Sequence, residues 1–343
     1  MKQTQEENPK LKIGILRALY LGDMLCIIPT VRAIRAAYPF ASITLVGLPW
    51  AKSFVERFQH YFDAFVEFPG WPGLPEQSYD HKIVLSFLND IQAQSFDIFL
   101  QMQGNGESTN AMCMLFGAKK LYGLRKTNDW CENDLDFPVS EDNEHEILRF
   151  LKLAKAMQIP IQGTHLEFPF LCNELEKTQL RLSEKKLSAK SCICLHPGAR
   201  DPRRRWPARN FARVGDQLAS AGYSVVLTGS TEESEILEEV GSLMSYPVLN
   251  TVREFGHLPL GELAALIHFS AGLVSNDTGV SHIASALEIP SVIIFSPFSD
   301  PVRWAPLNSK MHSVIPIDEA GSPELIGRTM LEKLKQTVPS FQE

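Results

Sequence analysis

Three consecutive residues in the second half of the chain, Asp277, Thr278 and Gly279, could together bind a phosphorylated ligand. They follow a short apolar run and precede a stretch with helical spacing that ends before Pro290. Gly279 would let a ligand approach the backbone closely, and the free N–H groups of a helix start suit a phosphate. The alternative is that Asp277 is only the N-cap of that helix. The turn by itself leaves both interpretations open.

An arginine cluster offers a second set of groups for a phosphorylated ligand. Four arginines fall within residues 200–205, directly after a turn that contains Gly198. The planar donor fork of arginine suits a diphosphate. A solvated basic loop is the alternative, but the position beside a glycine turn favours binding. Glu232 or Glu233, after the next predicted strand, could accept hydrogen bonds from ribose hydroxyls.

These residues need a parallel sheet to bring them together. The second half predicts strands at 191–195, 223–228, 271–276 and 291–295, with helices at 207–220 and 279–287 between them. Strands that alternate with helices indicate an α/β fold, in which ligands bind beyond the carboxyl ends of the strands. Small or polar residues stand at four of these ends: His196, Gly229, Asp277 and Ser296.

The first half starts with a similar unit. Strands are predicted at 11–16 and 42–46, and a helix from residue 22 to 38 is interrupted by Pro29. Asp23 takes the place at a strand end that Asp277 takes in the second half. An N-cap role is again the alternative.

A third strand of the first half, 97–102, leads into a loop rich in Gln, Asn and Ser. Its glycines match GxGxxG only in part, and no convincing acidic residue follows, so we do not predict a nicotinamide site. Gln103 and Asn105 would suit a hydroxyl-rich ligand such as a sugar. A polar loop without a ligand is an equally open interpretation.

Composition narrows the class of protein. The chain has 343 residues, which suggests about two domains. A formal net charge of -7 argues against a general nucleic-acid binder. The six cysteines form no CxxC pair, so we expect reduced thiols in a cytoplasmic protein. The sequence shows no apolar run long enough to span a bilayer and no signal peptide at its polar start.

The chain resembles the family 9 glycosyltransferases, the ADP-heptose:lipopolysaccharide heptosyltransferases. The resemblance covers nearly the whole chain and rests on three groups of residues that occur in order. The first is Leu21-Gly22-Asp23 with Pro29 and Pro39. The second is His196-Pro197-Gly198-Ala199 with Arg205-Trp206-Pro207. The third is Asn276-Asp277-Thr278-Gly279 with His282, Ser296-Pro297 and Asp300-Pro301.

This resemblance implies a GT-B fold, two Rossmann-like domains facing each other across a cleft, and an inverting transfer without a metal or other cofactor. Asp23 would be the catalytic general base. Arg204, where heptosyltransferases carry lysine, would contact the donor diphosphate; this departure keeps the charge but changes its geometry. We expect the other donor-binding residues to be His196, Gly198, Ala199, Arg205, Gly229, Glu232, Asp277, Thr278, Gly279 and His282, and the acceptor-binding residues to be Gly22, Gln103 and Asn105.

The expected domains are an acceptor-binding domain at 1–170, a linker at 171–189, a nucleotide-sugar-binding domain at 190–320, and a C-terminal helix and tail at 321–343 that pack back on the first domain. The donor would be an ADP-linked heptose and the acceptor a lipopolysaccharide-type glycan, used by a cytoplasmic monomer in peripheral contact with the inner membrane. The alternatives are a GT-B transferase or epimerase that uses a UDP- or GDP-sugar, and a non-catalytic protein that binds nucleotide-sugars.

Overall fold

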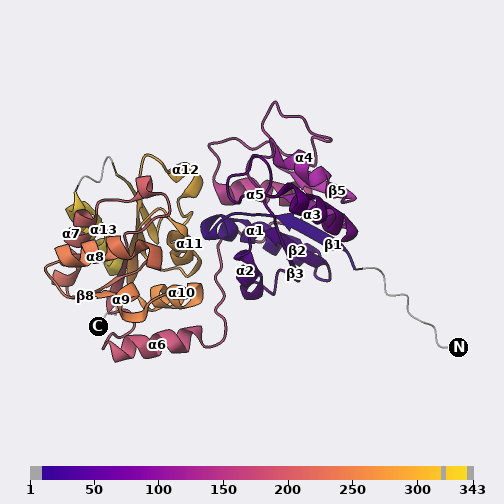
Figure 1. Ribbon diagram of the computed structural model, residues 1–343. Coiled ribbons are helices and arrows are strands. Elements are labelled where there is room, and N and C mark those ends of the chain that lie inside the picture. Colours follow the sequence, from indigo (N-terminus) through magenta and orange to yellow (C-terminus); the bar gives the residue numbers. More distant parts are fainter. Residues whose placement is uncertain (1–9, 318–321, 338–343) are drawn as a thin grey trace. The chain divides into compact units, whose positions relative to one another are not determined.

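A computed structural model describes residues 10–317 and 322–337 of the protein (Figure 1). The chain divides into two compact units, one up to Thr164 and the other from His165 onward. The sequence predicted a first domain at 1–170 and a linker at 171–189. The first unit of the structure ends earlier, at Thr164. The expected C-terminal tail beyond residue 337 lies outside the described residues.

The first domain is a five-stranded sheet in the order β3-β2-β1-β4-β5, in which every pair is parallel. Strand β1 lies in the middle, so the chain leaves it in one direction towards β2 and returns later to β4 on its other side. This is the strand order of a Rossmann fold, with the switch point between β1 and β4. The elements are β1 (Lys12–Leu16), α1 (Leu21–Ala37), β2 (Ser42–Gly47), α2 (Ala51–Arg57), β3 (Ala64–Glu67), α3 (His81–Ala93), β4 (Ile98–Gln101), α4 (Thr109–Met114), β5 (Lys120–Gly123) and α5 (Glu146–Ala156).

Helices cover this sheet because its strands are apolar on both faces. Residues 13–16 of β1 are fully or almost fully buried, as expected for a central parallel strand. Right-handed crossovers place α1 and α2 on one face and α3 and α4 on the other. Helices α3 and α4 contribute Phe87, Ile91 and Met112 to a core that also contains Leu16 and Phe99 of the sheet.

The second domain has a six-stranded parallel sheet in the order β11-β10-β9-β6-β7-β8. The order repeats that of the first domain with one more strand, and its switch point lies between β6 and β9. The elements are α6 (Glu174–Glu184), β6 (Cys192–His196), the 3-10 helix η1 (Pro202–Arg204), α7 (Ala208–Ser220), β7 (Ser224–Leu227), the 3-10 helix η2 (Thr231–Glu233), α8 (Ser234–Leu243), β8 (Val248–Asn250), α9 (Thr251–Phe255), α10 (Leu260–Phe269), β9 (Gly272–Asn276), α11 (Gly279–Ala286), β10 (Ser291–Phe295), α12 (Pro301–Trp304), β11 (His312–Pro316) and α13 (Pro323–Thr337).

Helix α13 packs on α7 and against β9 and β10 of its own domain. Its Met330 is fully buried and lies so close to Gly272 that a Cβ atom at Gly272 would overlap the methionine methyl group. Helix α6, which falls in the segment expected to be the linker, packs on α10. The second domain therefore includes helices from both ends of its sequence range.

The predicted strands and main helices of both halves are present, and most of their ends agree with the sequence to within two residues. The sequence did not predict β3, β5, β8 or β11, which are the strands at the edges of the two sheets. Across residues 10–317 and 322–337, none of the helices has both the length and the apolar character needed to span a bilayer.

Candidate active site

The turn after β9 does not place Asp277 at the N-cap of the following helix. The N-cap of α11 is Thr278, whose side chain makes no capping hydrogen bond, and Gly279 is the first helical residue. The N-cap interpretation of Asp277 is therefore wrong. Thr278 Oγ1 is buried and has no hydrogen-bond partner among the described residues. A buried hydroxyl without a partner beside the free N–H groups of a helix start is an arrangement that suits an anionic oxygen.

Asp277 is almost completely buried and lies between two side chains. Its Oδ2 accepts a hydrogen bond from Ser299, in the loop after β10, and lies 3.6 Å from Nη1 of Arg204. Nε of Arg204 is buried and has no hydrogen-bond partner among the described residues. The structure therefore brings Arg204 to the Asp277 turn from 73 residues earlier in the chain.

The other arginines of the cluster have different partners. Arg203 makes hydrogen bonds to the carboxylate of Asp201, which lower the pKa of Asp201 to about 2, and its guanidinium lies 4.8 Å from the ring centre of Phe298. Arg205 donates from Nε to the carbonyl of Ala199 at 2.8 Å. Arg203 and Arg205 thus have partners of their own, and Arg204 is the arginine with an unsatisfied donor beside Asp277.

Position 198 has room only for glycine, because a side chain of the same domain lies against its backbone. A Cβ atom at this position would overlap the carboxylate of Glu233, which also accepts hydrogen bonds from the backbone N–H of Ser230 at 2.9 Å and from its hydroxyl at 3.1 Å. Gly229 lies beside the same carboxylate, whereas Glu232 is exposed. Of the two acidic residues considered from the sequence, Glu233 is the one at the glycine turn.

His196 ends β6 beside this turn and is buried. Its Nδ1 lies 3.0 Å from the hydroxyl of Thr228 at the end of β7. Burial lowers the pKa of His196, and the carboxylate of Glu233 opposes this only in part, so the neutral form is favoured at neutral pH. His282, in the first turns of α11, is buried and stands edge-on to Trp304 of α12, with ring centres 6.3 Å apart.

Asn276 connects the two strand ends at the switch point. Its Oδ1 accepts a hydrogen bond from the backbone N–H of Trp206 at 3.0 Å, and its Nδ2 donates to the carbonyl of Pro197 at 2.8 Å. Asn276 and Trp206 are both buried, so these bonds are shielded from water. The asparagine therefore fixes the glycine turn after β6 and the start of α7 relative to the end of β9.

In the first domain, Asp23 lies in the first turn of α1, and the N-cap of that helix is Tyr20. The N-cap interpretation is wrong here as well. Oδ1 of Asp23 lies 3.0 Å from Nη2 of Arg17, which is fully buried at the end of β1. A quarter of the Asp23 side chain is exposed. The structure thus presents a carboxylate to solvent with a buried cation behind it.

The expected acceptor residues differ in their surroundings. Gly22 is buried in the first turn of α1. Gln103 is also buried, and its Oε1 accepts a hydrogen bond from the backbone N–H of Ala18 at 2.9 Å. Oδ1 of Asn105, which is partly exposed, accepts from the N–H of Glu107 at 3.1 Å. Gln103 therefore connects the loop after β4 to the loop after β1, at the switch point that also carries Asp23.

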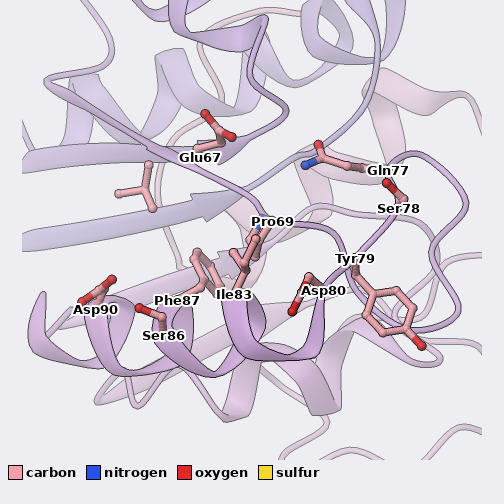
Figure 2. A pocket seen from close by; sticks show the side chains of 11 residues that line it. Glu67, Pro69, Gln77, Ser78, Tyr79, Asp80, Ile83, Ser86, Phe87 and Asp90 are labelled. Atoms are coloured by element: carbon pink, nitrogen blue, oxygen red, sulfur yellow. The ribbon is translucent and has the colours of Figure 1, made fainter.

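A cavity of about 500 Å³ lies at the end of β3, a feature that the sequence did not predict (Figure 2). The cavity is lined by Glu67 of β3, by Gln77, by Asp80 at the start of α3, and by Ile83 and Phe87 along that helix. Its lining mixes carboxylate and amide groups with apolar side chains. Because β3 and β1 are parallel, this cavity and Asp23 lie towards the same edge of the sheet, two strands apart.

The described residues contain no cluster of three or more His, Cys, Asp or Glu side chains that could hold a metal ion. The polar groups at the two switch points divide by charge: an arginine, a hydroxyl and a helix start in the second domain, and an accessible carboxylate in the first. The former suits an anionic leaving group, and the latter can accept a proton. Arg17 and Ser299 were not identified from the sequence, and Glu233 was named only as an alternative to Glu232. Only Arg17 had a local signal, because it stands at a strand end six residues before Asp23.

Comparisons with known proteins show the family and the fold of the chain. Residues 84–335 match the family profile described as glycosyltransferase family 9 (heptosyltransferase). The lipopolysaccharide heptosyltransferase 2 of Salmonella typhimurium is 26% identical over 321 residues, which cover 88% of this chain and 86% of that protein.

Two solved structures have the same fold. The family 9 glycosyltransferase of Veillonella parvula superposes with a TM-score of 0.78 at 19% identity and covers 95% of this chain and 98% of its own. The E. coli ADP-heptose lipopolysaccharide heptosyltransferase II gives 0.74 at 22% identity, with 95% and 99% covered. Two Rossmann-like domains of this kind form the GT-B fold that we expected from the resemblance.

Proposed function

The chain belongs to glycosyltransferase family 9, and from this membership we propose that it transfers a heptose from an ADP-linked donor to a lipopolysaccharide-type acceptor. The protein is a glycosyltransferase with a GT-B fold. The Salmonella typhimurium and E. coli relatives reported above are named as heptosyltransferases that act on lipopolysaccharide, which supports the same donor and acceptor classes here.

One observation carries the donor site. Arg204 Nε and Thr278 Oγ1 are buried donors without a partner among the described residues. Thr278 is the N-cap of α11, and Nη1 of Arg204 lies 3.6 Å from the carboxylate of the preceding residue, Asp277. Leaving a buried polar group unsatisfied costs about 1–3 kcal/mol. A diphosphate would satisfy both groups and the N–H groups at Gly279, so the site is best explained by a nucleotide-sugar donor.

The reaction follows from these groups. Asp23 accepts the proton of the acceptor hydroxyl, and the oxygen of that hydroxyl forms a bond to the anomeric carbon of the donor. The bond between that carbon and the diphosphate breaks, and its electron pair leaves with the nucleoside diphosphate. Arg204, Thr278 and the start of α11 stabilise the charge that grows on this leaving group. Attack from the opposite side inverts the anomeric configuration.

We expect no metal and no other cofactor in this reaction. The guanidinium of Arg204 and the helix N–H groups supply the positive charge that a metal would otherwise provide at the diphosphate. Transfer should therefore continue at an unchanged rate in excess EDTA. A rate that falls with EDTA and recovers with added Mg²⁺ would contradict this part of the proposal.

The first experiment is a calorimetric titration of the full chain with ADP, GDP and UDP in the absence of metal. A clear preference for ADP supports the ADP-heptose donor. A preference for UDP or GDP would overturn the heptose assignment and favour the alternative, a GT-B transferase or epimerase with another donor. Binding of ADP without release of ADP from ADP-heptose in the presence of heptose-deficient lipopolysaccharide would instead favour a non-catalytic binding protein.

We further propose that the protein is a monomer that works in the cytoplasm and touches the inner face of the membrane only peripherally. The support is its acceptor class, which is anchored in a membrane, together with the absence of a bilayer-spanning helix among residues 10–317 and 322–337. Light scattering at micromolar concentration and flotation with anionic vesicles test the two parts. A stable oligomer would contradict the first part, and no flotation the second.

A further inference from the structure

We propose that Arg17 is a positioning residue that holds the Asp23 carboxylate for catalysis, and that Glu146 and Arg149 in turn hold Arg17. This inference rests on the proposed role of Asp23 as the general base. The guanidinium of Arg17 is fully buried and contacts four different groups, so Arg17 forms more than a simple ion pair with Asp23.

The contacts of Arg17 fix its orientation. Nη1 donates to the carbonyl of Met102 at 2.5 Å, and Nη2 donates to Oδ1 of Asp23 at 3.0 Å and to Oε1 of Glu146 at 2.9 Å. The guanidinium carbon lies 4.7 Å from the ring centre of Phe150. Since the guanidinium is planar and rigid, contacts on both Nη atoms and on its face leave one position for the Asp23 oxygen that it holds.

Glu146 extends this arrangement to a loop at the same switch point. Its carboxylate is buried in the first turn of α5 and lies 3.1 Å from Arg149, one turn further along the helix. Arg149 also donates to the carbonyl of Gly104, in the loop after β4. This group of two arginines and two carboxylates connects β1, α1, α5 and the loop after β4.

This arrangement differs from an ordinary structural ion pair in one respect. The Arg17 and Glu146 side chains are each only 1% exposed, whereas Asp23 is 25% exposed. The network is thus closed on the protein side and open at the single carboxylate that the proposed reaction uses. A base held in this way stays in one orientation when the acceptor binds, which is the positional advantage that catalysis requires.

The test is a double-mutant cycle on the full chain with ADP-heptose and heptose-deficient lipopolysaccharide as substrates. If Arg17 acts through Asp23, Arg17→Met should lower kcat by ~10²-fold with little change in the KM for the donor. Adding Arg17→Met to Asp23→Asn should then cause no further loss, because the group that Arg17 positions is already inactive. Arg17→Lys should recover only part of kcat, since the single nitrogen of lysine cannot take the positions of both Nη atoms of the guanidinium.

Two further variants separate positioning from folding. Arg17→Met with Glu146→Gln removes one charge of each sign, so the double variant stays folded if Arg17→Met alone does not, and it should show the same loss of kcat. Arg35→Met is the matched control. Arg35, towards the other end of α1, pairs with Asp63 at 2.6 Å and donates to the carbonyls of Ala41 and Tyr61, so its loss should leave kcat unchanged.

The outcomes distinguish this inference from the proposed function. Wild-type turnover in Asp23→Asn would overturn the role of Asp23 itself. A large loss in Asp23→Asn together with normal kcat in folded Arg17→Met would overturn only the inference about Arg17. An equal, additive loss from Arg17→Met in the wild type and in Asp23→Asn would also overturn it, because the residue would then act independently of the base.

Discussion

At the scale of single residues, the proposed chemistry depends most on Asp23. Replacing it with Asn keeps the size of the side chain and removes its ability to accept a proton. We expect turnover to fall by about 10²-fold or more, while the affinity for ADP stays close to that of the wild type. Steady-state kinetics with ADP-heptose and calorimetry with ADP test the two halves of this prediction. Equal turnover in the two proteins would exclude Asp23 as the general base.

Arg204 and Arg203 are neighbours with different expected roles. Arg204→Met removes a charged donor from the Asp277 turn, and hydrogen bonds to charged groups contribute about 1.5–3 kcal/mol. We therefore expect ADP to bind at least 10-fold more weakly to Arg204→Met. Arg203 pairs with Asp201 and lies on Phe298, so Arg203→Met is the matched control and should bind ADP almost as well as the wild type. Equal affinity of the two variants would contradict the proposed diphosphate site.

The sequence predicted much of the candidate donor site because its residues stand in short motifs. Asp277, Thr278 and Gly279 are consecutive, and Arg204 lies in a visible charge cluster. Contacts between distant segments were not predictable in this way. Arg17 and Glu146 lie 129 positions apart, and their contact follows from how α5 packs on α1. Glu233 could not be chosen over Glu232 without knowing which of the two faces Gly198.

At the scale of elements, the Asn276 side chain holds the segments after β6 and β9 together at the switch point of the second sheet. Asn276→Ala would leave the N–H of Trp206 and the carbonyl of Pro197 buried without these partners. We expect the free energy of unfolding to fall by about 2 kcal/mol or more, and ADP to bind more weakly because the glycine turn is no longer fixed. Urea-induced unfolding and calorimetry measure the two effects.

Ser275 provides the control in the same strand. It is fully buried, and its hydroxyl has no hydrogen-bond partner among the described residues, so Ser275→Ala should leave stability equal or slightly higher. A similar loss of stability in both variants would mean that any change in β9 is harmful and that the asparagine bonds have no particular role.

Elements were predicted best where their residues are uniformly buried or regularly spaced. The central strands β1, β6, β9 and β10 are buried along their whole length except at Lys12, and all four were identified. The short strand β8 has only three residues, of which one is fully buried, so its apolar signal was too weak. The alternation of strands and helices predicted an α/β fold with parallel sheets. It did not predict the order of the strands in each sheet, because strand pairing is determined by packing.

At the scale of the whole molecule, stability should depend on pH through His312. This buried residue lies 2.7 Å from the hydroxyl of Ser291, and burial, with smaller effects from Lys333 and His282, lowers its pKa to about 4. In the unfolded chain its pKa is about 6.5, so below that pH the unfolded state takes up a proton that the folded state does not. The stability that His312 contributes is thus complete above pH 6.5 and is lost as the pH falls to about 4.

As the pH falls to about 4, we expect protonation of His312 in the unfolded state to lower the free energy of unfolding by up to about 3 kcal/mol. Urea-induced unfolding at several pH values between 7.5 and 4 measures it, with His312→Gln as the comparison, because glutamine can keep a hydrogen bond to Ser291 without titrating. The stability of the wild type should fall more steeply than that of the variant. Parallel curves for the two proteins would show that His312 does not titrate as described.

The position of α13 has a consequence for how the protein is made. All five strands of the first sheet are complete by residue 123, so that domain can fold while the ribosome is still translating the second. The core of the second domain remains open at Gly272 until Met330 of α13 has been synthesised and can cover it. During translation the strands β6, β9 and β10 therefore lack the cover of α13 until its residues have left the ribosome, and apolar surface exposed in this interval favours aggregation.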